Sequence, residues 1–115
     1  MNDETYPNPT RELAQKRRSL GPNIDSAFQA FSQAVFADGA LSNKTKQLIA
    51  VAVAHVTQCP YCIKGHTKAA QRAGATSQEL MEAVWVAAEM RAGAAFAHST
   101  LMLTALDPLD SRADT

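Results

Sequence analysis

The sequence has few aromatic residues, no excess charge of either sign and no long hydrophobic run. Aromatic residues are 6% of the 115, and 11 lysines and arginines balance 11 aspartates and glutamates. Nucleic-acid binding usually requires a basic surface, so the absence of net charge argues against nucleic acid as the main partner. No apolar run approaches the roughly 18 residues of a membrane-spanning helix, so no membrane partner is expected.

The first nine residues also lack the basic start and the apolar segment of a secretory signal peptide. We expect residues 1–9 and 107–115 to be flexible tails and residues 10–106 to form a single domain. The expected location is the cytoplasm, which is a reducing compartment. There, a close-spaced cysteine pair is more often catalytic or metal-binding than a structural crosslink.

No alternation of polar and apolar residues marks a strand, and the chain is predicted to be all-α. Thr76 to Glu79 has the T-x-x-E form of a capping box, which starts a helix. Gly93 is expected to break or kink that helix. The prediction is a compact array of about five to six helices without a sheet. The first helix is expected over 10–19, the second from 22–25 to Gly39, and the third from Ser42 onward. The fourth is expected over 59–73, the fifth from Thr76 onward, and the last over 94–106.

Two of these segments, from Leu48 onward and over 84–97, are rich in alanine and apolar on nearly all sides. A domain of this size cannot cover every such face with its own helices. Part of this surface is therefore expected to be buried between subunits.

The chain has only two cysteines, Cys59 and Cys62, and His66 follows them. On a helix, positions i, i+3 and i+7 lie on one stripe. In the first turn of a helix the unpaired amides and the helix dipole stabilise a thiolate, which is the nucleophilic form of cysteine. Pro60 suits that first turn. His66, one turn beyond Cys62, is placed to take up the Cys62 proton and later deliver it.

This pattern predicts redox chemistry. A peroxide oxidises a thiolate to a sulfenic acid, and a second thiol nearby condenses with it to form a disulfide. An external reductant then reopens the disulfide by thiol exchange. No cofactor and no metal are expected for such a reaction.

Other kinds of site use some of the same residues. A structural zinc site with Cys59, Cys62 and His66 would need His55 or His98 as a fourth ligand. Attachment of a c-type haem requires histidine directly after the second cysteine, where this chain has Ile63. A thioredoxin-like site requires a βαβ context, and no strands are predicted. Two inert core cysteines are the remaining alternative.

Residues 41–75, LSNKTKQLIAVAVAHVTQCPYCIKGHTKAAQRAGA, resemble the core of the AhpD-like alkylhydroperoxidase group of the carboxymuconolactone decarboxylase superfamily. The resemblance extends roughly over 28–106, and its most specific part is C-x-x-C-x-x-x-H after Lys-Thr-Lys. It implies an all-α homo-trimer or homo-hexamer with peroxidase or disulfide reductase activity. It also implies that Cys62 forms the sulfenic acid, that Cys59 is proton donor and resolving thiol, and that His66 belongs to a proton relay.

The sequence departs from the pattern of this family at two positions. Gln47 stands where the family commonly has the glutamate that begins the relay, and Tyr61 stands where a histidine often lies between the cysteines. Glutamine cannot take up a proton at neutral pH. His55 is therefore a candidate substitute base, with Gln47 positioning a water. Glu89 is a candidate acid, or else an ordinary carboxylate held by Arg91 or by a partner.

The leading hypothesis is a thiol-dependent hydroperoxide reductase, an antioxidant enzyme that cycles between a dithiol and the Cys59–Cys62 disulfide. Its expected partners are a small hydroperoxide and a dithiol, thioredoxin-like or dihydrolipoyl reductant. The alternatives are a thiol–disulfide adaptor for another substrate and a non-enzymatic oligomeric module that binds zinc or senses oxidation. Lactone decarboxylation is disfavoured, because decarboxylase members of the superfamily lack the cysteine pair.

Overall fold

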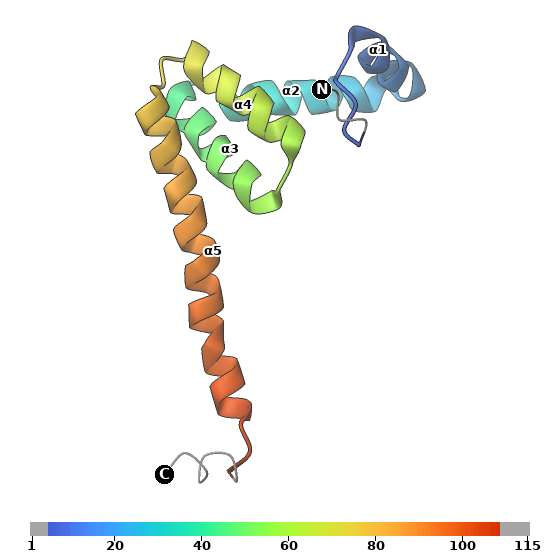
Figure 1. Cartoon of the computed structure of the whole chain (residues 1–115). Helices are drawn as coiled ribbons and strands as arrows, with labels where there is room; N and C mark the ends of the chain where they lie inside the picture. Colours follow the sequence, from blue (N-terminus) through green and yellow to red (C-terminus); the bar gives the residue numbers. More distant parts are fainter. Residues whose placement is uncertain (1–4, 109–115) are drawn as a thin grey trace.

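The computed structural model describes residues 5–108, which form five helices and no strand (Figure 1). The predicted all-α fold without a sheet is confirmed. The predicted tails fall partly on residues 1–4 and 109–115, outside the described residues, and the domain boundaries stay a prediction. The helices are α1 (Arg11–Leu20), α2 (Pro22–Phe36), α3 (Asn43–Thr57), α4 (Pro60–Arg72) and α5 (Ser77–Ala105).

Side chains satisfy the free amides where three of the helices begin. Thr10 and Ser42 each accept a hydrogen bond from the amide three residues later, at 3.2 and 3.1 Å. At the start of α5, the Glu79 amide donates to Thr76 Oγ1 at 3.0 Å and the Thr76 amide donates to Glu79 Oε1 at 2.9 Å. The predicted capping box is therefore confirmed, and each of these bonds pairs an amide that has no partner within its helix.

Two residues in the left-handed region turn the chain sharply. Gln58, at φ 58°, ends α3 and reverses the chain directly into α4. Gly74, at φ 98°, follows α4, and the Ala75 amide donates to the Ala70 carbonyl across this turn at 2.9 Å. Glycine adopts this conformation without strain, which explains its place after a helix end. Because the first turn is so short, α3 and α4 lie side by side.

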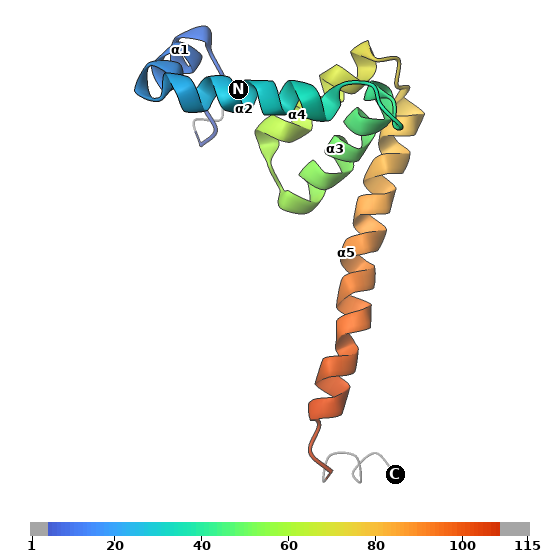
Figure 2. The same cartoon turned by 180° about the vertical axis from the view of Figure 1, so that it is seen from behind.

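The core of the chain lies where α3 packs against both α4 and the first half of α5 (Figures 1 and 2). Its buried side chains are small, so the helix axes can approach closely. One buried residue is polar, Gln47 on α3, with 7% of its surface exposed. The buried apolar residues are Val51, Ala54, Ala70, Ala75 and Ala87.

Helix α5 runs without interruption for 29 residues, a length of about 43 Å. The expectation that Gly93 breaks this helix is wrong, and the predicted sixth helix over 94–106 is its continuation. A single glycine costs only about 1 kcal/mol in a helix, and the strong helix-forming alanines on both sides outweigh that cost. No helix among residues 5–108, α5 included, combines the length and apolar character needed to cross a membrane.

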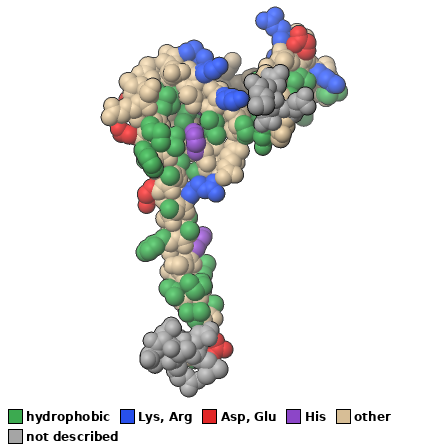
Figure 3. Space-filling view, viewed as in Figure 1, with side chains coloured by type: hydrophobic (Ala, Val, Ile, Leu, Met, Phe, Trp, Pro, Cys, Tyr) green, Lys and Arg blue, Asp and Glu red, His purple; other side chains and the backbone are tan. Residues whose placement is uncertain are grey.

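The single chain is elongated, whereas a compact array was expected. Its radius of gyration is 20.5 Å, against about 13 Å for a compact domain of this length. Its accessible surface is 9272 Å², against about 6,100 Å² for a compact protein of this mass. The outer half of α5 projects away from α3 and α4, and hydrophobic side chains lie along it (Figures 1 and 3). Phe96, for example, is 82% exposed.

Candidate functional site

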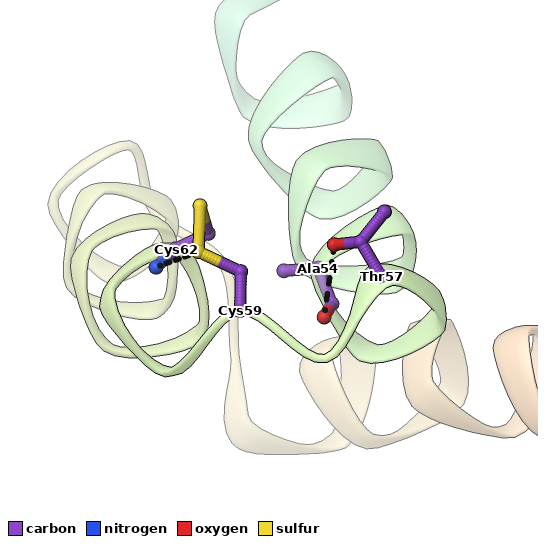
Figure 4. Close-up of a disulfide and its surroundings, with 4 residues drawn as sticks. All are labelled: Ala54, Thr57, Cys59 and Cys62. Atoms are coloured by element: carbon purple, nitrogen blue, oxygen red, sulfur yellow. Dashed lines mark hydrogen bonds between the residues drawn. A yellow bond between two sulfur atoms is a disulfide. The ribbon is translucent and has the colours of Figure 1, made fainter. Parts of the chain in front are cut away.

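Cys59 and Cys62 lie at the start of α4 and form a disulfide, with their Cα atoms 5.3 Å apart (Figure 4). Cys59 is the N-cap, and Pro60 is the first residue of the helix. The Cys59 amide donates to the Ala54 carbonyl at 3.1 Å, which ties the start of α4 to the end of α3. The sharp turn at Gln58 therefore fixes the position of the sulfur pair relative to the core.

The two sulfur atoms differ in their surroundings. The Cys62 amide donates to Cys59 Sγ at 3.2 Å, so the Cys59 sulfur occupies the place of a capping oxygen (Figure 4). Negative charge at this position is favoured by the amide and by the positive end of the helix dipole. When the disulfide is reduced, these two effects stabilise a thiolate on Cys59.

Cys62 and His66 together line two cavities of about 410 and 470 Å³. The wall of the first is mainly apolar, with Val35, Phe36, Ile49 and Val53. Polar residues are more frequent around the second: Ser32, Gln33, Gln47 and Tyr61. Cys59 lines neither of these cavities. Of the two cysteines, Cys62 is therefore the one that lines both cavities.

Three helices hold His66 in place. Nδ1 of His66, on α4, lies 2.8 Å from Oε1 of Gln47 on α3. The imidazole stacks on the Phe36 ring of α2, with ring centroids 5.1 Å apart and an interplanar angle of 26°. Gln47 was expected to position a water, but it contacts His66 directly.

His55 and Glu89, two of the predicted relay residues, lie elsewhere. His55 Nδ1 donates to the Val51 carbonyl at 2.7 Å, and its side chain lines two other cavities, in neither of which Cys62 or His66 takes part. Glu89 is exposed on α5, and Arg91, its expected partner, donates to the Val56 carbonyl at 2.9 Å. The structure therefore does not bring either candidate to the cysteine pair.

Tyr61, between the two cysteines, contacts a segment far away in the sequence. Its hydroxyl donates to the Pro7 carbonyl at 2.8 Å, and its ring meets the Tyr6 ring edge-on, with centroids 6.1 Å apart. Because Tyr61 also lines the second cavity, the segment around Pro7 lies near the entrance to the site. Residues 6 and 7 belong to the predicted flexible tail, yet they lie against α4.

Residues 5–108 contain no cluster of side chains that could bind a metal ion. No group of three or more histidine, cysteine, aspartate or glutamate side chains in this range is placed to hold a metal ion. The zinc alternative needed His55 or His98 as the fourth ligand. His55 lies at other cavities, and His98 lies on the exposed outer part of α5.

Two residues of the site were not singled out from the sequence as functional. Phe36 lines both cavities, and Lys46, which lines the first, was noted only within the Lys-Thr-Lys motif. Lys46 Nζ donates to the Ala37 carbonyl at 2.6 Å and so caps the end of α2. The spacing Gln47, Val51, Ala54 (i, i+4, i+7) was a usable signal that Gln47 faces the core.

Comparison with known proteins gives consistent matches. Residues 22–105 match the carboxymuconolactone decarboxylase family. An uncharacterized protein in the cox locus of Paracoccus denitrificans is 59% identical over 110 residues, covering 96% of this chain and 98% of that protein. An uncharacterized protein of Cupriavidus necator is 36% identical over 103 residues, covering 87% and 91%. The crystal structure of a carboxymuconolactone decarboxylase family protein from Legionella pneumophila has a TM-score of 0.66 and 39% identity, covering 69% of this chain and 70% of that one.

Proposed function

This chain belongs to the carboxymuconolactone decarboxylase family, and on that premise we propose that it is a thiol-dependent hydroperoxide reductase. The observation that carries the proposal is the arrangement of the bonded pair. Cys59 and Cys62 are joined at the start of a helix, and Cys62 faces two cavities beside His66. A reversible disulfide, an open sulfur and an adjacent base are the parts that the reaction needs.

In the oxidising half of the reaction, the Cys62 thiol first gives its proton to His66. The Cys62 thiolate then attacks the terminal oxygen of the hydroperoxide, and the O–O bond breaks. The leaving alkoxide takes the proton from His66 and departs as an alcohol, while Cys62 becomes a sulfenic acid. The Cys59 thiol condenses with this sulfenic acid, which forms the disulfide and releases one water.

In the reducing half, a dithiol reductant attacks Sγ of Cys62, the cysteine that lines both cavities. The S–S bond breaks and Cys59 leaves as a thiolate. Its position as N-cap stabilises that charge, and a stabilised thiolate is a faster leaving group. The second thiol of the reductant then releases Cys62, so that the enzyme returns to the dithiol and the reductant becomes a disulfide.

The apolar wall of the 410 Å³ cavity favours an organic hydroperoxide over hydrogen peroxide. Its aliphatic and aromatic side chains gain from contact with an alkyl or aryl group, which hydrogen peroxide lacks. The reductant is a dithiol, thioredoxin-like or dihydrolipoyl group.

Thiol titration tests this function. One equivalent of cumene hydroperoxide should remove two free thiols per chain, and dithiothreitol should restore them. Cys62→Ser should abolish the reaction. Cys59→Ser should stop at a sulfenic acid, which dimedone traps and mass spectrometry detects. Two thiols that survive excess hydroperoxide would exclude the proposal.

A second candidate function, thiol–disulfide exchange with another substrate, rests on the same open Cys62. The two functions are separated by comparing second-order rates of the reduced protein with cumene hydroperoxide and with a small disulfide such as oxidised lipoamide. A faster reaction with the disulfide, together with slow peroxide consumption, would favour the exchange function.

We also propose that the working form is a homo-oligomer, a trimer or a hexamer. The surface in excess of a compact chain is about 3,000 Å² on one chain, more than the roughly 1,000–2,500 Å² that each partner contributes to an obligate interface. The exposed apolar residues of α2 and of the outer half of α5 are the surface available for such contacts.

A further inference from the structure

We propose that Gln47 is a positioning residue that holds His66 as the neutral tautomer with its proton on Nδ1. Nε2 is then the atom that accepts the Cys62 proton, and the proton relay of this chain ends at His66. The inference deepens the proposed function and rests on it for the identity of the reaction. The state of His66 itself is testable without any peroxide.

The first step of the argument is the chemistry of the contact. His66 Nδ1 lies 2.8 Å from Gln47 Oε1. An amide oxygen has lone pairs and no proton, so it only accepts hydrogen bonds. Nδ1 must therefore carry the proton of the neutral ring, which leaves the lone pair on Nε2. A base needs this lone pair in order to take the thiol proton.

The second step is the rigidity of the two groups. Gln47 is 7% exposed and shares the inner face of α3 with Val51 and Ala54. If its amide turned away, it would leave a buried polar group without a partner, which is costly. The imidazole of His66, which is the other partner in this contact, stacks on the Phe36 ring. Both the tautomer and the plane of His66 are thus fixed by neighbours on other helices.

The third step concerns charge. The titratable groups that line the two cavities beside His66 are the cationic Lys46 of α3 and Tyr61 and Cys62 of α4, and α2 contributes none. No carboxylate is among the residues that line either cavity. Gln47 can accept a hydrogen bond from the imidazolium but cannot take its proton. The proton from Cys62 therefore stays on Nε2 until the leaving alkoxide takes it.

The tautomer is tested directly by 15N NMR of the reduced protein. Above the pH at which the imidazole titrates, the signals lost in a His66→Asn spectrum should show a protonated Nδ1 and an unprotonated Nε2. The reverse pattern would mean that the Gln47 amide is oriented the other way, and would overturn the proposal. This measurement uses the unaltered protein and does not depend on how any variant at Gln47 folds.

The positioning role is tested by alkylation of Cys62 with iodoacetamide as a function of pH, in a Cys59→Ser background that leaves a single thiol. Gln47→Met removes the acceptor and should lower the rate about tenfold, the equivalent of one hydrogen bond. Gln47→Glu restores the acceptor and should retain the rate. Its added charge should move the midpoint of the pH profile upward by about one unit or more.

Gln71→Glu is the matched control, since it adds the same charge on α4 at an exposed position outside the two cavities. Its midpoint should match that of the unaltered protein. An unchanged rate in Gln47→Met, or an unmoved midpoint in Gln47→Glu, would overturn the positioning role. A protein that shows the expected tautomer and pH shift but does not consume hydroperoxide would instead refute the proposed function alone.

Discussion

Glu79 stabilises the start of α5 through both of its carboxylate oxygens. Oε1 accepts the Thr76 amide at 2.9 Å, and Oε2 pairs with Lys44 Nζ of α3 at 2.9 Å. The hydrogen bond from the Thr76 backbone, followed by the one from Lys44, lowers the pKa of Glu79 below its ordinary value. A carboxylate whose pKa is lower in the folded state stabilises the fold above its unfolded pKa, and this contribution disappears as the pH falls through the folded pKa.

We therefore expect Glu79→Gln to be less stable than the unaltered protein at pH 7, and the difference to shrink as the pH falls from the ordinary pKa of glutamate through the lowered pKa of Glu79. Glutamine retains the shape of the capping box without the charge. Urea unfolding at pH 7 and pH 3 measures the difference. Glu82→Gln, one turn later on the exposed side of α5, is the control and should show a much smaller change with pH. A Glu79 effect that persists unchanged at pH 3 would show that charge is not its cause.

At the scale of single residues, the sequence identifies the two cysteines and His66 but not Gln47 as the residue that contacts His66. Cys59, Cys62 and His66 are close in the chain, so helix geometry alone predicts that they share a stripe. The contact between Gln47 and His66 joins two helices, and it depends on how α3 and α4 cross. His55 was the plausible substitute base by sequence distance. It lies one residue off the inner row of Gln47, Val51 and Ala54, so it points to other cavities.

At the scale of the helices, two glycines of α4 and its end allow the effect of backbone conformation on stability to be compared. Gly65 lies inside the helix and Gly74 follows its end, and a Cβ atom at either position would meet nothing within 4 Å. The two differ in backbone conformation, since Gly74 has φ 98°. Gly74→Ala should destabilise the protein by about 1–2 kcal/mol, the cost of a left-handed alanine. Gly65→Ala should stabilise it by about 0.5–1 kcal/mol, because alanine is the better helix former.

Urea unfolding of the two variants side by side measures both changes. The same chemical substitution is made within α4 and just after its end, so any general effect of an added methyl group is shared. Equal shifts of the same sign would contradict the role assigned to the turn at Gly74.

The positions of the helices follow from local chemistry, which is why most were predictable. Thr10, Ser42 and the capping box at Thr76 supply start signals, and Gly74 supplies a stop. Gly93 is the exception, because its effect depends on the summed propensity of its neighbours and not on the glycine alone.

For the whole molecule, the exposed outer half of α5 leads to a prediction about assembly. If second copies cover it, the melting temperature should rise with protein concentration, since association stabilises the folded chain. Phe96→Asp should lower the mass measured by analytical ultracentrifugation, because a charge cannot be buried in an apolar contact without a partner. Phe96 is suited to this test because it is 82% exposed in the single chain.

Gln78→Asp is the charge-matched control. It lies in the first turn of α5, where an acidic side chain is favourable, and it should leave the mass unchanged. A monomeric mass for the unaltered protein at all concentrations would contradict the proposed assembly.

The elongated shape was the part of the fold least accessible from the sequence. Alanine-rich, all-round apolar segments indicated surface to be buried, but they did not specify whether it would be covered within one chain or between chains. The answer depends on whether the chain folds back at Gly93, and the structure shows that α5 continues past this residue as one helix.

The hydrogen bond from Tyr61 to Pro7 has a practical consequence for handling the protein. Tyr6 and Pro7 lie against Tyr61, between the two cysteines, so a group attached to this segment would lie close to the thiols. The end of α5 at Ala105 lies at the opposite end of the molecule (Figure 1). Fusions intended for measurements of thiol reactivity are therefore best attached behind the last helix, and a difference between the two tagging schemes would report on access to Cys62.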